Sequence, residues 1–221
     1  MVMILRKKTN QAIFWCLILA VVFVIGCAPQ IYTNPAFYEA KVRHKTIAIL
    51  PFVVTIDSSK LPKEITAETI DKMQKDEAYL FQQELYTKFL TKQQKGEYSV
   101  IFQDIDETNA LLGKSGIAYE NLSKFTKKEL VDVLGIDAII SGNIRRSQPM
   151  STGSAVVIGV LFGAWGSTNR VDVSLTIHEG LDGQLLWKYD HEASGSVGSS
   201  SEKLADSLMK SISKKFPYKV E

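Results

Sequence analysis

The stretch TIAILPFVVTI, residues 46–56, is the part of the chain that best indicates the fold. It is a continuous apolar run rich in β-branched residues, which is typical of a strand buried on both faces of a sheet. Pro51 interrupts the run, and proline cannot donate a hydrogen bond to a neighbouring strand. We therefore expect an edge position, a bulge at Pro51, or a second half of the strand that leaves the sheet.

Further strands are expected downstream, beginning with a short one at residues 98–102 and an apolar one, IDAIISGNI, at residues 136–144. In residues 171–178 apolar and polar side chains alternate, which predicts a strand with one face in water. Asp182-Gly183 tolerates the positive φ of a tight hairpin turn. Residues 171–178 and 185–197 are therefore predicted to be antiparallel neighbours.

Four segments carry the signals of helices. In residues 66–95 Phe81, Leu85 and Phe89 recur every four residues and define one buried helical face. Asp106 is expected to cap a brief helix that runs to Leu112. The last two predicted helices begin at the capping boxes of residues 126–129 and 199–202 and end near Gly135 and Pro217, respectively.

The order of these elements predicts an α/β fold: a mixed, partly parallel sheet flanked by helices, with a C-terminal β-hairpin and a closing helix. Residues 46–216 are expected to form this single domain, and residues 217–221 a C-terminal tail. The length suits one domain of ordinary size.

Three stretches resemble a known group of proteins: IAILPF (47–52), LGIDAIISGNI (134–144) and VDVSLTIHEGLDGQLLWKYD (171–190). Together with the closing helix they are similar to the envelope lipoproteins grouped around the curli-secretion lipoprotein CsgG. That group includes the penicillin-binding-protein activator LpoB and putative ABC-transport-assist lipoproteins. The resemblance covers residues 46–216 and implies the α/β fold and an envelope lipoprotein.

The N-terminus has the layout of a secretory signal. A basic head, Arg6-Lys7-Lys8, precedes the apolar residues 12–25, and Gly26 and Cys27 follow. Residues 24–27 resemble the lipobox of bacterial lipoproteins, which implies cleavage between Gly26 and Cys27 and a diacylglycerol and an N-acyl chain on Cys27. A retained transmembrane anchor is the alternative, although the run is short for a membrane span of about 20 residues.

Residues 1–26 are therefore predicted to be a lipoprotein signal peptide and residues 27–45 a lipidated tether. The aromatic residues of the tether are expected either to dock on the domain or to lie at the lipid interface. Ala28 stands where Asp signals inner-membrane retention in many enteric-type bacteria, which favours the periplasmic side of the outer membrane and leaves the inner membrane as the alternative. Removing Arg6, Lys7 and Lys8 changes the formal net charge from +2 to −1, so no nucleic-acid partner is expected.

The sequence carries little catalytic signal. Gly113-Lys114-Ser115 is like the end of a phosphate-binding loop, but Thr108 stands where that motif needs glycine. His178 and His191 fall on the paired hairpin strands, where they could approach each other, and solvated surface is favoured over a metal site. Cys27 would be acylated, and Cys16 lies in the signal. We expect no enzyme, no metal and no cofactor beyond the lipid.

Residues 148–169 form a glycine-rich, apolar insertion without a charge from Gln148 to Asn169. Either it covers the sheet, or it is exposed and meets lipid or a protein partner. The expected contact residues are Val157, Ile158, Leu161, Phe162 and Trp165. In CsgG an insertion of this kind supplies pore hairpins, but the insertion here lacks strict alternation.

The predicted function is a non-catalytic, lipid-anchored periplasmic module that binds or assembles envelope proteins. Its partners would be the membrane, through the lipid, and another envelope protein or a second copy of the chain. A subunit of an oligomeric secretion or transport-assist complex is one alternative, and a hydrolase with an unrecognised site is another.

Overall fold

The structure is a computed structural model that describes residues 30–58, 61, 65–147, 170–198 and 200–220. Its sheet has the strand order β1-β7-β6-β5-β2-β4, and β3 pairs with β5 off this path. Strands β2–β4, β2–β5 and β3–β5 are parallel, whereas β5–β6, β6–β7 and β1–β7 are antiparallel. The predicted mixed α/β fold is therefore confirmed. The strands are β1 (Ile31–Thr33), β2 (Thr46–Ile49), β3 (Val53–Ile56), β4 (Ile101–Phe102), β5 (Ala138–Ser147), β6 (Arg170–Glu179) and β7 (Leu185–Ser194).

The stretch around Pro51 gives two strands that run along the same neighbour. β2 and β3 both pair in parallel with β5, and between them the Leu50 amide still donates to the Ile140 carbonyl at 2.9 Å. Within the described residues β3 has β5 as its sole partner. The predicted edge position is therefore confirmed, because a proline beside an edge strand sacrifices no ladder bond on its open side. The predicted bulge is present too, since the register passes from Ile49 opposite Ile140 to Val53 opposite Asn143, which leaves one extra residue around Pro51. The second half of the strand does not leave the sheet.

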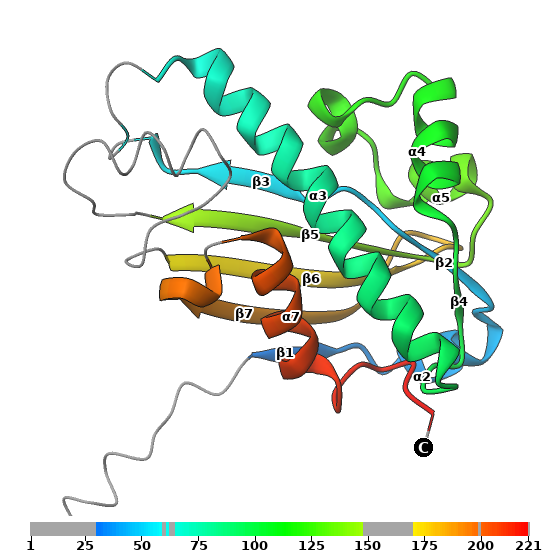
Figure 1. The fold of residues 1–221 in the computed structure, drawn as a ribbon. Coiled ribbons are helices and arrows are strands. Elements are labelled where there is room, and N and C mark those ends of the chain that lie inside the picture. Colours follow the sequence, from blue (N-terminus) through cyan, green and yellow to red (C-terminus); the bar gives the residue numbers. More distant parts are fainter. Residues whose placement is uncertain (1–29, 59–60, 62–64, 148–169, 199, 221) are drawn as a thin grey trace, which may run out of the picture.

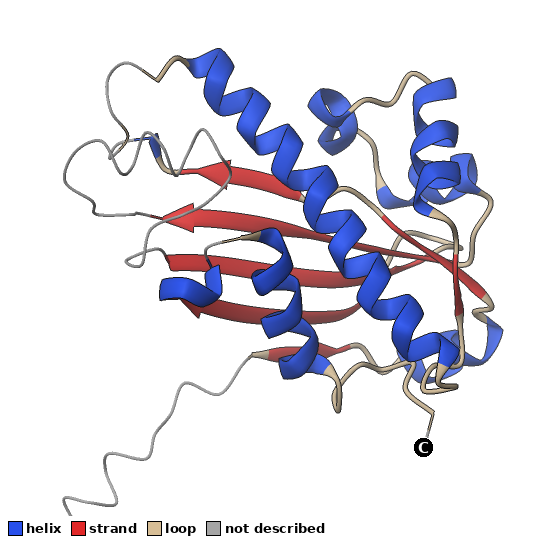
Figure 2. Cartoon of the chain, in the orientation of Figure 1, coloured by secondary structure: helices blue, strands red, loops and turns tan. Residues whose placement is uncertain are grey.

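Helices α3 (Ala67–Gln94) and α7 (Ser201–Ile212) cover one face of the sheet (Figures 1 and 2). As predicted, α3 buries Phe81, Leu85 and Phe89. The ring of Phe89 stacks on Phe102 of β4 at 4.8 Å between centroids. Leu204, Leu208 and Ile212 form the buried stripe of α7, so this face holds the larger core.

The other face is covered at the β2 end by α4 (Ile105–Lys114), the 3₁₀ helix η2 (Tyr119–Lys124) and α5 (Lys127–Leu134). The predicted capping box of α5 is present, and in it the Glu129 carboxylate accepts from the Thr126 amide. For α4 the predicted cap was wrong. Asp104 caps the helix, because its carboxylate accepts from the amides of Asp106 and Glu107 at 2.9 and 3.2 Å.

The segment predicted as a tether, residues 27–45, is folded from its fourth residue onward. Ile31–Thr33 form β1 against β7, and Phe37–Arg43 form helix α2. Phe37 is buried against Tyr218, with ring centroids 5.3 Å apart. Docking of the tether's aromatic residues on the domain was one of the two expectations, and Phe37 confirms it. The strand and the helix were not predicted, because β1 has three residues and α2 two turns, which is too short for periodicity to be visible.

The predicted C-terminal tail is also part of the domain. Tyr218 is fully buried, and Lys219 forms an isolated bridge with Tyr98. After β7 the chain forms the 3₁₀ helix η3 (Gly195–Gly198) and then α7. Among the residues described, no helix combines the length and hydropathy that a membrane crossing requires.

Candidate functional site

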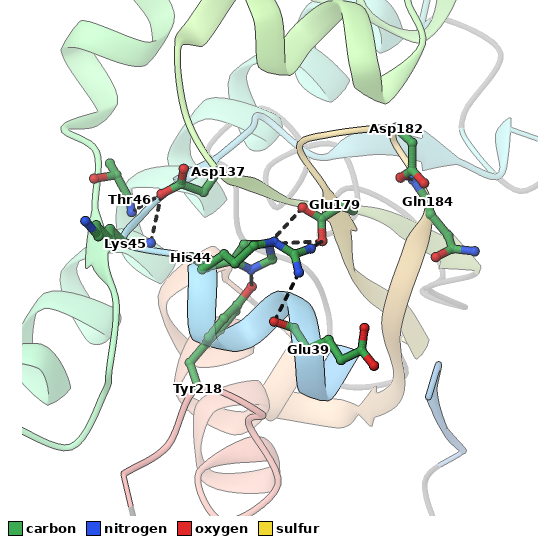
Figure 3. Close-up of polar contacts among 10 residues, drawn as sticks. Glu39, His44, Lys45, Thr46, Asp137, Glu179, Asp182, Gln184 and Tyr218 are labelled. Atoms are coloured by element: carbon green, nitrogen blue, oxygen red, sulfur yellow. Dashed lines mark hydrogen bonds and ion pairs between the residues drawn. The ribbon is translucent and has the colours of Figure 1, made fainter. Parts of the chain in front are cut away.

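A buried polar cluster joins three segments that lie far apart in the sequence (Figure 3). His44 follows α2, Glu179 is the last residue of β6, and Tyr218 lies near the C-terminus. His44 Nδ1 is 2.5 Å from the Tyr218 hydroxyl oxygen, and His44 Nε2 is 3.1 and 3.2 Å from the Glu179 carboxylate oxygens. All three residues are less than a tenth exposed. We call these three residues the polar clasp.

The proton positions in the polar clasp follow from its partners. The carboxylate of Glu179 can only accept, so His44 Nε2 carries a proton and donates. In the neutral imidazole His44 Nδ1 then accepts from the Tyr218 hydroxyl. Burial, and the nearby charges of Glu179 and Asp137, raise the pKa of Tyr218 far above its ordinary value. Tyr218 therefore stays protonated and keeps this role across the physiological pH range.

The polar clasp has the order of a catalytic relay, but its hydroxyl group is not accessible. A nucleophile or acid must reach a substrate atom, and Tyr218 has no exposed surface. Glu179 is also engaged by Arg43, whose Nη2 lies 3.5 Å from the carboxylate. Each polar group thus has a partner inside the fold, and the arrangement holds the N-terminal segment, the hairpin and the C-terminus together.

An open hollow with a volume of about 450 Å³ is lined by His44 and Glu179 of the polar clasp and by Arg43, Asp137 and α5. The Asp137 carboxylate accepts from the backbone amides of Lys45 and Thr46, at 2.8 Å each. It therefore fixes the chain where α2 turns into β2 (Figure 3).

The exposed part of the sheet forms a second polar surface. It lies over β5, β6 and β7 beside a hollow of about 630 Å³ and includes Arg145, Asp172, Ser174, Asp190 and Glu192. Arg170 bridges Glu192 at 2.9 Å, and Lys188 bridges Asp190 at 2.7 Å. The predicted polar face of residues 171–178 is therefore present, but its side chains on β6 are only partly exposed, and Ser174 Oγ is buried without a hydrogen-bond partner in the described structure. Its mixed charges suit a polar protein partner better than one small ligand of single charge.

The two hairpin histidines do not meet, contrary to one possibility raised by the sequence. His178 is opposite Leu185, whereas His191 is opposite Val173. Because successive residues face opposite sides of a strand, the two imidazoles point to different faces of the sheet. His191 Nε2 is 2.9 Å from the Ser207 hydroxyl of α7. Both rings are partly buried rather than fully solvated. The described residues contain no group of three or more potential metal ligands.

Lowering the pH from 7 to 5 is expected to reduce the free energy of unfolding of the wild type by on the order of 1 kcal/mol more than that of the His178→Gln variant. Burial, with a smaller effect of Lys127, lowers the pKa of His178 to about 4 from an ordinary 6.5. Its Nδ1 is buried without a hydrogen-bond partner in the described structure.

Between pH 6.5 and 4 the unfolded chain binds a proton that the folded chain does not. The free energy of unfolding therefore falls as the pH falls. The remaining exposure of the ring reduces the effect below its full value. Urea unfolding at both pH values measures it, and equal losses in the two proteins would contradict the assignment.

The remaining predicted site residues lie outside the described residues. These are Gly26 and Cys27, and the contact set Val157, Ile158, Leu161, Phe162 and Trp165. The fold does place the ends of the insertion: Ser147 and Arg170 face each other as the last pair of β5 and β6. The insertion therefore leaves and re-enters the sheet at one point.

The polar clasp was missed by sequence reasoning. Its members are separated by 135 and 174 residues. His44 stood in the segment predicted as a tether, Glu179 at the end of an ordinary alternating strand, and Tyr218 in the predicted tail. No local pattern signals such a contact.

No protein-family model and no curated protein matches the chain. Solved structures do resemble it. A single-substitution variant of the PelC dodecamer from Paraburkholderia phytofirmans is 10% identical over 84% of this chain and 94% of its own, with a TM-score of 0.39. Lipoprotein GNA1162 from Neisseria meningitidis is 11% identical over 77% of this chain and 98% of its own, with a TM-score of 0.38.

The LpoB C-terminal domain from Salmonella enterica is 8% identical over 68% of this chain and 83% of its own, with a TM-score of 0.34. The group that the sequence resembles is thus represented among the similar structures. At these TM-scores the likenesses carry no argument about function, and we base the proposal that follows on this chain's own residues.

Proposed function

We propose that this chain is a non-catalytic binding or assembly module of the bacterial envelope, held on the membrane by lipid on Cys27. The observation that carries the proposal is Gly26-Cys27 at the end of an apolar run, followed within four residues by the first strand of a folded domain. The internal pairing of the polar clasp suits a structural role for its three residues. We propose the open polar face of β5–β7 and the apolar insertion as the surfaces that bind partners.

Replacing Cys27 by alanine is expected to abolish acylation and to leave the precursor uncleaved, because the lipoprotein peptidase requires a lipid-modified cysteine. Metabolic labelling with a fatty acid, together with the size of the product, measures both effects. Cys16→Ala is the matched control and should retain full labelling. Label retained in Cys27→Ala would show that the lipid is attached elsewhere.

We assign the protein to the periplasmic side of the outer membrane because Ala28, not Asp, follows Cys27. The inner membrane is the alternative, and fractionation of the two membranes distinguishes them. The partner would be another envelope protein or a second copy of the chain. Size measurement of detergent-extracted protein separates a ring from a monomer, and a pull-down identifies a different partner.

In the insertion, Phe162→Asp is expected to weaken association with lipid or a partner while changing the melting temperature by no more than a surface substitution does. A charge on a contact surface must be desolvated only in the complex. Liposome flotation and size analysis measure association, and Ser151→Asp supplies the same charge at a polar position of the insertion. If Phe162 covers the sheet instead, its carboxylate replacement is buried without a partner, and stability should fall by several kcal/mol.

A further inference from the structure

The fold leaves very little chain between the proposed lipid and the first strand. Gln30 is the first described residue, and its carbonyl accepts from the Asp190 amide of β7 at 3.1 Å. Only Ala28 and Pro29 separate Gln30 from Cys27. Three residue steps span at most roughly 11 Å when fully extended. A lipid on Cys27 therefore holds the start of β1 within a distance similar to the thickness of the headgroup layer, which is about 5–8 Å.

The segment next to this point is rich in exposed apolar and aromatic side chains. Ile31 and Tyr32 on β1 are 43% and 48% exposed, and Tyr38 and Val42 on α2 are 71% and 83% exposed. We call these four residues the anchor-proximal patch. Ile31 and Tyr32 point to opposite faces of the edge strand β1, so a surface that contacts both lies along that edge. In Figure 1 the chain enters at β1 and continues into α2 along the lower border of the molecule, away from α4 at the top.

Helix α2 is held rigidly by its other side. Phe37 and Ala40 are each 1% exposed, and Phe37 packs edge-on against Tyr218. Tyr38 and Val42 are four residues apart, so they lie next to each other on the outer side of the helix. The apolar pair is thus presented to the surroundings and cannot turn inward without unfolding α2.

The net charge of this segment favours contact with an anionic lipid surface. Residues 28–45 contain three cations, Lys41, Arg43 and Lys45, and one acid, Glu39, giving 3 − 1 = +2 with His44 neutral. The mature chain has a net charge of −1, so the rest of it carries −3. Arg43 is paired with Glu179, so the attraction to anionic lipid depends on Lys41 and Lys45. Lysines beside tyrosine and aliphatic residues suit the interface of a bilayer that contains anionic lipid.

From these observations we infer that the anchor-proximal patch lies against the lipid headgroups, so that β1 and α2 form the membrane-facing side of the domain. The inference rests on the proposed anchoring through Cys27. It replaces a flexibly tethered domain by one held in a fixed orientation.

The test uses the full lipidated chain in vesicles of phosphatidylethanolamine and phosphatidylglycerol. Val42→Cys and Leu80→Cys each receive an environment-sensitive fluorophore. Leu80 is the matched control because it is an aliphatic residue on α3 with 50% exposure. We expect the label at position 42 to shift to the blue, to be quenched by spin-labelled lipid and to have a severalfold lower iodide quenching constant than the label at position 80.

Flotation with the vesicles, measured on the same samples, separates the two proposals. Failure to float would overturn the anchoring and the inference together. A protein that floats while both labels remain equally open to iodide, or are equally shielded from it, would overturn the orientation alone. Shielding that follows protein concentration rather than spin-labelled lipid would assign the anchor-proximal patch to a second copy of the chain and would also overturn the inference.

Discussion

Gly142→Ala is expected to destabilise the domain by about 3 kcal/mol or more, equivalent to a fall in melting temperature of roughly 6–12 °C. A Cβ at this position of β5 would lie 2.1 Å from the Ser174 carbonyl oxygen and 2.4 Å from a ring carbon of Phe52. The first contact is backbone of β6, and the second is a fully buried ring packed against Phe81. Neither can move without opening the sheet or the core.

The matched control for this experiment is Gly113→Ala. Gly113 lies in α4, and a Cβ there would have no atom within 4 Å. Alanine should therefore stabilise the helix by roughly 0.5–1 kcal/mol. Thermal unfolding of both variants gives the comparison. Similar melting temperatures for the two would contradict the close approach of Phe52 to β5.

Arg146→Met is expected to cost about 3–5 kcal/mol, because it leaves the Glu77 carboxylate buried without its cation. Arg146 is 1% exposed, and its Nε lies 2.7 and 2.6 Å from the two carboxylate oxygens of Glu77, with a further contact from Nη2. This pair joins the end of β5 to α3. The double variant Arg146→Met with Glu77→Leu should recover most of the loss, since an apolar pair needs no charge compensation.

Lys72→Met provides the control on the same helix. Lys72 and Asp76 form an exposed pair four residues apart at 3.2 Å, so its loss should cost less than about 0.5 kcal/mol. Urea unfolding measures all variants. If Arg146→Met cost no more than Lys72→Met, the buried pair would contribute nothing specific to the junction of β5 and α3.

The sequence predicted part of the open polar face on β5–β7. Alternation along residues 171–178 predicted which side chains of β6 face water, because the period of a strand fixes the faces. The Asp-Gly turn also predicted β7 as the neighbour of β6. The sequence could not predict that β5 would extend this surface through Arg145, since strands not joined by a hairpin are paired by tertiary packing. The sequence also did not predict that His178 is partly buried, because this burial depends on tertiary packing.

Helices and turns that depend on neighbouring residues could be predicted from the sequence alone. The four-residue spacing of Phe81, Leu85 and Phe89 produced α3, and the capping box at Thr126 produced the start of α5. The Asp-Gly turn at residues 182–183 produced the hairpin, with Gly183 at φ 76°. Each effect acts over a few residues, so it is visible in a short window of sequence.

The positions of the N-terminal and C-terminal segments depend on tertiary packing. β1 exists because the edge of β7 offers unpaired backbone groups, and α2 exists because Tyr218 covers Phe37. His44, Glu179 and Tyr218 are brought together by the same packing. Short elements like these gain too little from local hydrogen bonds to form alone. Their stability comes from partners more than a hundred residues away, which no local pattern can reveal.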